Sequence, residues 1–150
     1  MKTTLALILS TLVSTAYSQC KVAMDEVDAF TGKRTVALKG DYLGTLVQVA
    51  ARIDSSYYLY LSTHQDVGCS QTGQSQVWFK LDDGTIIQLP HVGSLNCKGS
   101  FTIKLDDYIA ELKTHNVTTI RLIGSTSYHT EELKKGQDTI SKGLTCLTSL

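Results

Sequence analysis

No run of apolar residues in this 150-residue chain approaches the roughly 20 that a transmembrane helix needs. Basic and acidic side chains are equal in number, 14 of each, and are interspersed along the chain. The sequence therefore has no patch of one sign that would indicate nucleic acid or an anionic membrane surface as a partner. Proline occurs once, as Pro90, and no proline-rich linker or repeat divides the chain.

The motifs of common catalytic and metal sites are also missing. No GxSxG segment is present, the cysteines lack CxxC spacing, and no histidine pair has HxxxH spacing. We therefore expect no catalytic residue, no metal site and no cofactor. The four histidines fall in predicted loops or at helix ends, where we expect them at the surface: His64, His91, His115 and His129.

The first residues have the pattern of a secretory signal peptide. Lys2 precedes an apolar stretch from Leu5 to Val13, and small residues stand at Ala16 and Ser18. We expect cleavage after Ser18, so that residues 1–18 are removed.

The remaining residues, 19–150, are enough for a single domain with its own core. We expect this domain to be exported, either to the periplasm or out of the cell. The rival prediction is a lipoprotein anchored through Cys20. Lipoprotein processing requires a small residue before the cysteine, and Gln19 occupies that place, so the sequence favours a soluble product over a lipid anchor.

Four cysteines follow the predicted cleavage site, and an even number in an exported chain usually forms disulfides. Four cysteines allow three pairings. We favour Cys20 with Cys146, because chain termini often lie close together in a domain, and Cys69 with Cys97 across a polar middle region.

Apolar residues recur at every second position through most of the chain, which indicates β-strands. We expect an α+β domain in which two helices pack on an antiparallel β-sheet of about six or seven strands. The strands are predicted at 35–38, at 47–53 and 57–62 as one hairpin, at 77–81 and 86–89 as another, at 101–105 and at 118–123. The helices are predicted from Asp106 to about His115 and from about Thr130 towards the C-terminus.

One strand has an informative alternation of apolar and polar residues. Val47, Val49 and Ala51 alternate with Gln48 and Arg52. This order predicts that the apolar set faces the core and that Gln48 and Arg52 face water.

Aromatic residues provide the candidate binding surface. Tyr58, Tyr60 and Trp78 lie on strands that we expect to be adjacent, where they would form one aromatic face for a protein, a peptide or a glycan. The alternative is that these rings fill the core of the sheet. Arg121 points to the opposite side of its strand from two apolar neighbours and is either a surface charge or an interface anchor.

Short motifs spread over the chain give it a resemblance to a protein family. These motifs are the cysteine after the signal, DEVDAFTGKR (Asp25 to Arg34), LDDGTIIQL (Leu81 to Leu89), TTIRL (Thr118 to Leu122) and LTCL (Leu144 to Leu147). In them the chain resembles small exported proteins of unknown function from Gram-negative bacteria. These motifs are turns, strand cores and terminal cysteines. The resemblance implies export and a single domain, and it assigns no activity.

The sequence therefore favours a noncatalytic binding or interaction module. A small hydrolase or metal-dependent enzyme is the first alternative, and it would require polar side chains from separate loops to converge in a pocket. An inhibitor or stabiliser of another envelope protein is the second alternative.

Overall fold

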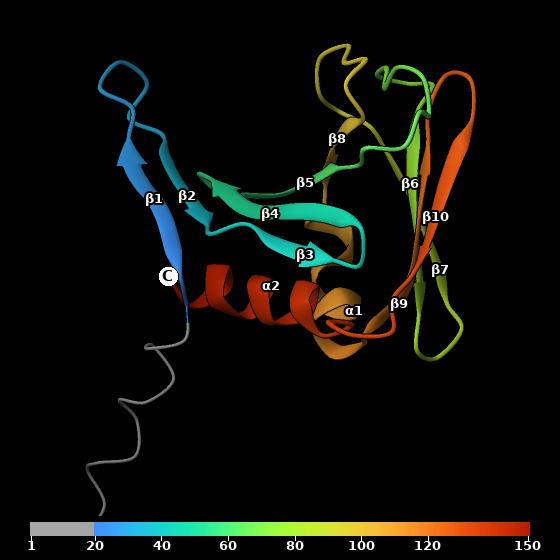
Figure 1. Ribbon diagram of the computed structural model, residues 1–150. Helices are drawn as coiled ribbons and strands as arrows, with labels where there is room; N and C mark the ends of the chain where they lie inside the picture. The colour runs from blue at the N-terminus through green and yellow to red at the C-terminus, as the bar shows by residue number, and fades with distance from the viewer. Residues whose placement is uncertain (1–19) are drawn as a thin grey trace, which may run out of the picture.

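The structure, a computed structural model, describes residues 20–150 (Figure 1). The predicted signal peptide, residues 1–18, lies outside this range. The described residues form ten strands, a short 3-10 turn and two α-helices. In chain order these elements are β1 (Val22–Val27), β2 (Arg34–Leu38), β3 (Asp41–Leu43), β4 (Leu46–Ile53), β5 (Ser56–Ser62), β6 (Gln76–Leu81), β7 (Ile86–Pro90), β8 (Ser100–Lys104), the 3-10 turn (Asp106–Tyr108), α1 (Ile109–Thr114), β9 (Val117–Ile123), β10 (Tyr128–Glu132) and α2 (Thr139–Ser149).

The strands form two antiparallel sheets. The first has the order β1-β2-β4-β5-β8, with β3 also paired to β4, and the second has the order β10-β9-β6-β7. The α+β class is confirmed. The prediction of one sheet of six or seven strands is wrong, since ten strands form two sheets. Alternation along a sequence identifies a strand but does not identify the strand beside it.

Both predicted hairpins are present and are closed by turn residues suited to them. Asp54, between β4 and β5, has a φ of 55°, which Asp tolerates better than most residues. Between β6 and β7, the Asp83 carboxylate accepts the backbone N–H of Thr85 at 2.9 Å, and Gly84 has a φ of 89°. The turn residues therefore fix the register of each pair of strands.

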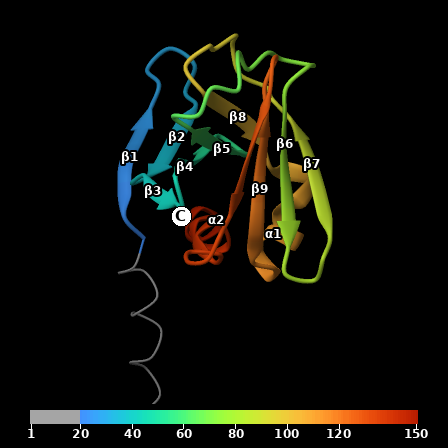
Figure 2. The ribbon, with the colours of Figure 1, turned by 45° about the vertical axis from the view of Figure 1, so that its right-hand side comes forward.

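The core lies between the two sheets and is completed by the helices. In Figure 2, α2 is seen nearly end-on between the first sheet and the β9-β6-β7 strands. Leu59 and Phe101 from the first sheet, Phe79 and Ile120 from the second, and Leu144 from α2 are at most 1% exposed and belong to one cluster. The described residues thus share a single hydrophobic core.

The orientation of β4 is opposite to the prediction. Gln48 and Ala50 are 5% and 3% exposed and lie beneath α2, whereas Val47 and Val49 are half-buried on the other face. Helix α2 is held there partly by Arg52, whose Nη1 donates to the backbone carbonyl of Leu147 at 2.9 Å. The helix covers the face that carries the polar residues, which the alternation within one strand could not reveal.

The helix predicted from about Thr130 is also wrong at its start. Residues Tyr128–Glu132 form β10, which pairs with β9, and α2 begins only at Thr139. Gly136, between β10 and α2, has a φ of 71°, which lies outside the range of strand and helix, so neither element continues through it. The last turns of the predicted helix are confirmed, with Ile140, Leu144 and Leu147 buried on one face.

Two disulfides join the cysteines in the pairing favoured by the sequence, Cys20 with Cys146 and Cys69 with Cys97. The first ties Cys20, two residues before β1, to α2. The second joins the loop after β5 to the loop before β8. Among residues 20–150 no helix is long and apolar enough to cross a membrane.

Candidate functional site

The three aromatic residues of the predicted surface do not lie on one face. Tyr58 and Tyr60 are on β5 in the first sheet, and Trp78 is on β6 in the second sheet. Because β5 pairs with β4 and β8 only, the prediction that these strands are adjacent is wrong. The two tyrosines therefore belong to a surface different from that of Trp78.

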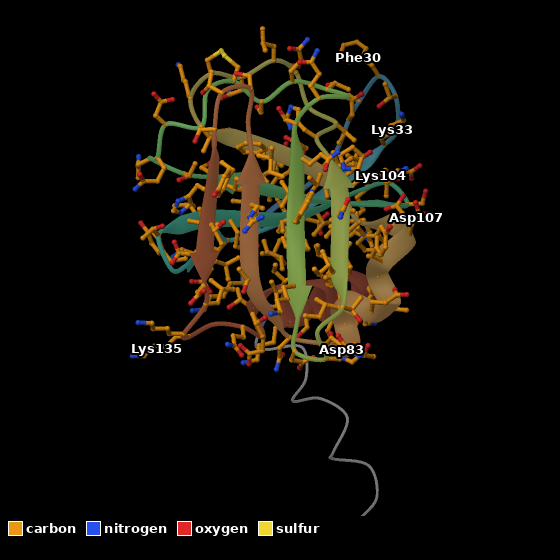
Figure 3. The ribbon with its side chains drawn as sticks, turned by 90° about the vertical axis from the view of Figure 1, so that its right-hand side faces the viewer. Phe30, Lys33, Asp83, Lys104, Asp107 and Lys135 are labelled. Atoms are coloured by element: carbon orange, nitrogen blue, oxygen red, sulfur yellow. A yellow bond between two sulfur atoms is a disulfide. The ribbon has the colours of Figure 1, made fainter. Side chains whose placement is uncertain are left out.

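Trp78 lies on the outward side of the second sheet, which we call the open face. Its outward side chains alternate with buried core residues along each strand. No helix of the described chain crosses this side of the sheet, which faces the viewer in Figure 3. The open face includes Gln76, Trp78, Ile86, Gln88, Arg121, Tyr128 and Thr130.

Strand register brings an arginine between two aromatic rings on the open face. Trp78 is directly opposite Arg121, and Arg121 is directly opposite Thr130. The guanidinium carbon lies 5.9 Å from the centre of the Trp78 ring and 5.0 Å from the centre of the Tyr128 ring. Arg121 Nε donates to Thr130 Oγ1 at 2.9 Å. The side chain is thereby fixed in position by cation–π contacts and one hydrogen bond.

The indole of Trp78 is held as well, because its Nε1 donates to Gln76 Oε1 at 2.8 Å. At the margins of the same face, Ile86 is 57% exposed and Tyr128 is 62% exposed. Tryptophan, tyrosine and arginine are the residues most enriched where truncation weakens protein–protein binding. The open face thus has the composition of an interface and has its central groups already ordered.

Tyr58 and Tyr60 face outward from the first sheet. Tyr60 is opposite Val49 on one side and Thr102 on the other, and it is 37% exposed. Desolvation by its surroundings raises the pKa of the Tyr60 hydroxyl, with a smaller contribution from Tyr58. Lys104 is directly opposite Tyr58 on β8, but its ammonium group is paired with Asp106 at 3.0 Å, and no cation–π contact to either tyrosine is present among residues 20–150.

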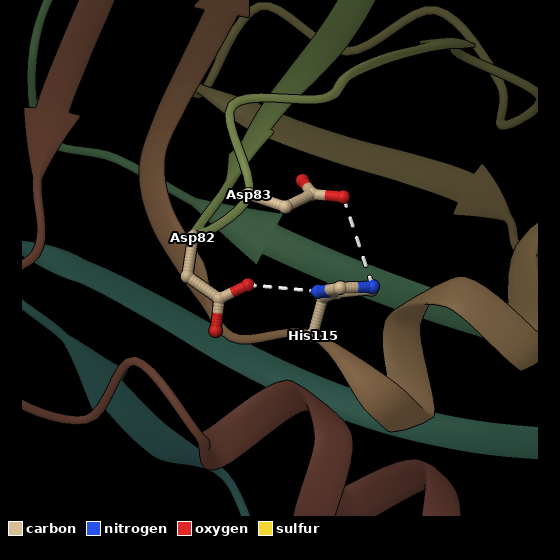
Figure 4. A group of neighbouring side chains, drawn as sticks. All are labelled: Asp82, Asp83 and His115. Carbon is tan, nitrogen blue, oxygen red and sulfur yellow. Dashed lines mark hydrogen bonds and ion pairs between the residues drawn. The ribbon is translucent and has the colours of Figure 1, made fainter.

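A second constellation joins the β6–β7 turn to the start of β9 (Figure 4). His115 Nδ1 lies 2.9 Å from Asp82 Oδ1, and His115 Nε2 lies 3.7 Å from Asp83 Oδ2. The other oxygen of Asp82 accepts the backbone N–H of Asn116 at 3.1 Å. The sequence analysis missed this group, because its members are brought together only by the pairing of β6 with β9.

The three side chains place possible metal ligands within 4.8 Å of one another. Their arrangement, however, has one carboxylate toward each nitrogen of the His115 ring. That geometry suits a protonated imidazole, which donates from both nitrogens, better than a metal ligand, which needs a free lone pair. We interpret the group as a set of ionic contacts that joins the β6–β7 turn to the segment before β9, and we call Asp82, Asp83 and His115 the ionic latch.

The latch makes stability depend on pH. The hydrogen bond to Asp82 raises the pKa of His115 above its usual 6.5, so its contribution is present below 6.5 and is lost as pH rises through the raised value. The pKa of Asp82 is lowered by the Asn116 N–H and then by His115, and that of Asp83 mainly by the Thr85 N–H. Their contribution is present above 3.8 and is lost as pH falls through the lowered values.

The variant His115→Gln should remove the alkaline part of this dependence. In the native protein we expect the urea midpoint to fall as pH rises through the raised pKa of His115, because the imidazole loses its charge beside the two aspartates. Urea titrations on both sides of that pKa would measure the effect. A His115→Gln protein whose midpoint falls by the same amount as the native one would contradict the latch.

The other histidines differ from the surface prediction in one case. His91 is 1% exposed, its Nδ1 accepts the backbone N–H of Thr102 at 3.0 Å, and its Nε2 lies 3.1 Å from the Ser94 carbonyl. The prediction was wrong for His91 because the loop after β7 folds back onto β8. His64 is exposed, and His129 Nε2 lies 3.3 Å from Glu131 Oε2.

The cysteines are not nucleophiles in this structure, since all four are bonded in pairs.

No family model matches the chain, and searches of curated proteins and of solved structures found no similar protein. Function therefore has to be inferred from the side chains of this chain, and the open face is the strongest candidate among them.

Proposed function

We propose that this protein is an exported, noncatalytic module that binds a partner protein through the open face. Two disulfides support the exported location, because such bonds persist in oxidising compartments such as the periplasm or the cell exterior. The resemblance to small exported proteins of Gram-negative bacteria is in line with this location. An inhibitor or stabiliser of an envelope protein is one form of the same function, and the identity of the partner decides it.

The observation that carries the proposal is the position of Arg121 between Trp78 and Tyr128. Only its Nε is engaged, by Thr130, and its two terminal nitrogens form no hydrogen bond with residues 20–150. A guanidinium held in this way can donate two parallel hydrogen bonds to a carboxylate of a partner. The aromatic rings on either side supply apolar contact area at low entropic cost, and the Trp78 ring is held by its hydrogen bond to Gln76.

The extent of the face favours a protein over a glycan or a short peptide. Exposed apolar side chains lie on its two edge strands, Ile86 on β7 and Tyr128 on β10, with Arg121 between them. A partner that contacts all three must span the full width of the sheet. A single sugar stacked on Trp78 would leave the outer two uncovered.

The test compares variants of the two outer surfaces. The double variant Trp78→Ala, Arg121→Ala is expected to bind the partner about 30-fold more weakly or worse, as loss of roughly 2 kcal/mol at a hot spot implies. Binding would be measured by capture from envelope and culture-medium fractions, followed by titration of the captured protein. The matched variant Tyr58→Ala, Tyr60→Ala on the first sheet should bind as the native protein does.

Two outcomes would contradict the proposal. One is loss of capture in the tyrosine variant with capture retained in the Trp78 and Arg121 variant, which would move the interface to the first sheet. The other is binding of a purified glycan that depends on Trp78 alone. Circular dichroism melting of each variant shows whether an observed loss reflects unfolding.

A further inference from the structure

A cavity of about 690 Å³ lies between α2 and the edge of the first sheet, on a part of the molecule separate from the open face. Figure 1 shows α2 running beneath β1, β2, β3 and β4. Leu38, Gly143 and the Cys20–Cys146 disulfide form part of its walls. Sites for small organic molecules are commonly of this size and combine apolar walls with a few polar groups.

One wall of the cavity carries a buried polar atom without a partner. Gln48 is 5% exposed, and its Oε1 has no hydrogen-bond partner among the described residues. Buried side-chain oxygens are nearly always paired in native proteins. The oxygen itself is closed to solvent, but Gln48 lines the cavity, so a rotation of its amide can bring Oε1 to a molecule there that carries an N–H or O–H.

A carboxylate lies beside this amide. Asp41 on β3 is directly opposite Gln48 on β4, so both side chains leave the sheet on the same side, and Asp41 also lines the cavity. One Asp41 oxygen accepts the backbone N–H of Tyr42 at 2.8 Å. Two neighbouring acceptors, one of them charged, are best satisfied by an ammonium group, which has three donors.

Lysine side chains also line the cavity. The backbone N–H of Lys39 donates to the carbonyl of Lys21 at 2.7 Å, so the two lysines are neighbours across the β1–β2 end of the sheet. Neither ammonium group forms an ion pair within residues 20–150. The third cavity lysine, Lys142, is paired with Asp138. Lys21 and Lys39 are thus free to hold an anion.

We propose that this cavity binds a small zwitterion, a free amino acid or a short peptide. Its ammonium group is held by Gln48 Oε1 and Asp41, and its carboxylate by Lys21 and Lys39. This site is independent of the partner-binding function proposed above, and no reaction is implied.

The test uses the twenty free amino acids and their glycyl dipeptides as probes on the purified, disulfide-bonded protein. At millimolar concentration at least one probe should raise the melting temperature, and calorimetric titration should give its Kd. The N-acetylated and the C-terminally amidated forms of that probe should each bind at least about 10-fold more weakly, since each lacks one charge. If no probe binds, or if the blocked forms bind as well as the zwitterion, the proposal is wrong.

Variants assign the two ends of the ligand. Gln48→Leu should abolish the shift caused by the probe and raise the melting temperature of the free protein by about 2 °C or more, because an unpaired buried oxygen is removed. Asp41→Asn, at an exposed position, provides a second test that does not perturb the core and should also weaken binding. Lys39→Gln should weaken binding of the zwitterion without changing that of its amidated form. Lys98→Gln, at a lysine outside the cavity, is the control and should leave probe binding unchanged. Probe binding that Gln48→Leu and Asp41→Asn both leave unchanged would overturn the assignment.

Discussion

Replacement of both Cys20 and Cys146 by serine is expected to lower the free energy of unfolding by about 5 kcal/mol. The bond closes a loop with a sequence separation of 126 residues, and the chain-entropy relation assigns a larger effect to a longer loop. The bond also anchors β1, whose residues are all exposed and which pairs only with β2. Urea denaturation of the native and double-serine proteins would measure the difference.

The second disulfide provides the comparison for this prediction. Cys69 and Cys97 are separated by 28 residues, so the same relation gives about 3.5 kcal/mol for their replacement by serine. The order of the two effects is the sharper test, because both variants lose one bond of the same kind. A larger loss from the Cys69 and Cys97 variant would show that local packing, rather than loop length, determines the stabilisation.

Features set by neighbouring residues could be predicted from the sequence. The β6–β7 hairpin follows from alternating apolar residues around Asp83 and Gly84, whose backbone conformations suit a tight turn. The pairing of Cys20 with Cys146 follows from the general closeness of chain ends. These inferences need no knowledge of which distant strands meet.

Features set by distant pairing could not be predicted in the same way. Trp78 was assigned to the face of Tyr58 because consecutive strands were assumed to be adjacent, yet β6 pairs with β9, about 40 residues further along the chain. That pairing places Arg121 beside Trp78 and His115 beside Asp82. Alternation gave Arg121 its outward direction but not its neighbours, so the open face and the ionic latch both required the structure.

Gln48 illustrates a different limit. A polar residue between two valines is ordinarily assigned to the wet side of a strand, and here α2 covers that side instead. The hydrophobic pattern is therefore reversed at the cavity. Conflicts between local pattern and tertiary environment are expected to concentrate at functional sites, which supports the assignment of a ligand to this cavity.

Gly99→Ala is expected to destabilise the protein by about 4 kcal/mol, more than any substitution at an exposed turn. Gly99 precedes β8 and has a φ of 72°, in the left-handed region. A Cβ atom there would lie 2.3 Å from the backbone oxygen of Thr63, and the Gly99 carbonyl already accepts the Thr63 N–H at 2.9 Å. A rigid backbone group cannot move aside as a flexible side chain can, so the loop after β5 must separate from β8.

Gly73→Ala separates this clash from the cost of the backbone conformation. Gly73 has a φ of 79°, and a Cβ atom built there meets nothing within 4 Å, so only the left-handed conformation is penalised, by about 1 to 2 kcal/mol. Urea denaturation of both variants measures the difference between their losses of unfolding free energy. If Gly99→Ala fails to fold while Gly73→Ala folds, that result also agrees with the prediction. Equal losses in the two variants would mean that the Thr63 loop yields to the added methyl group. The loop before β8, which holds Cys97 and Gly99, would then be able to shift, and the Cys69–Cys97 disulfide would be the main contact that holds it in place.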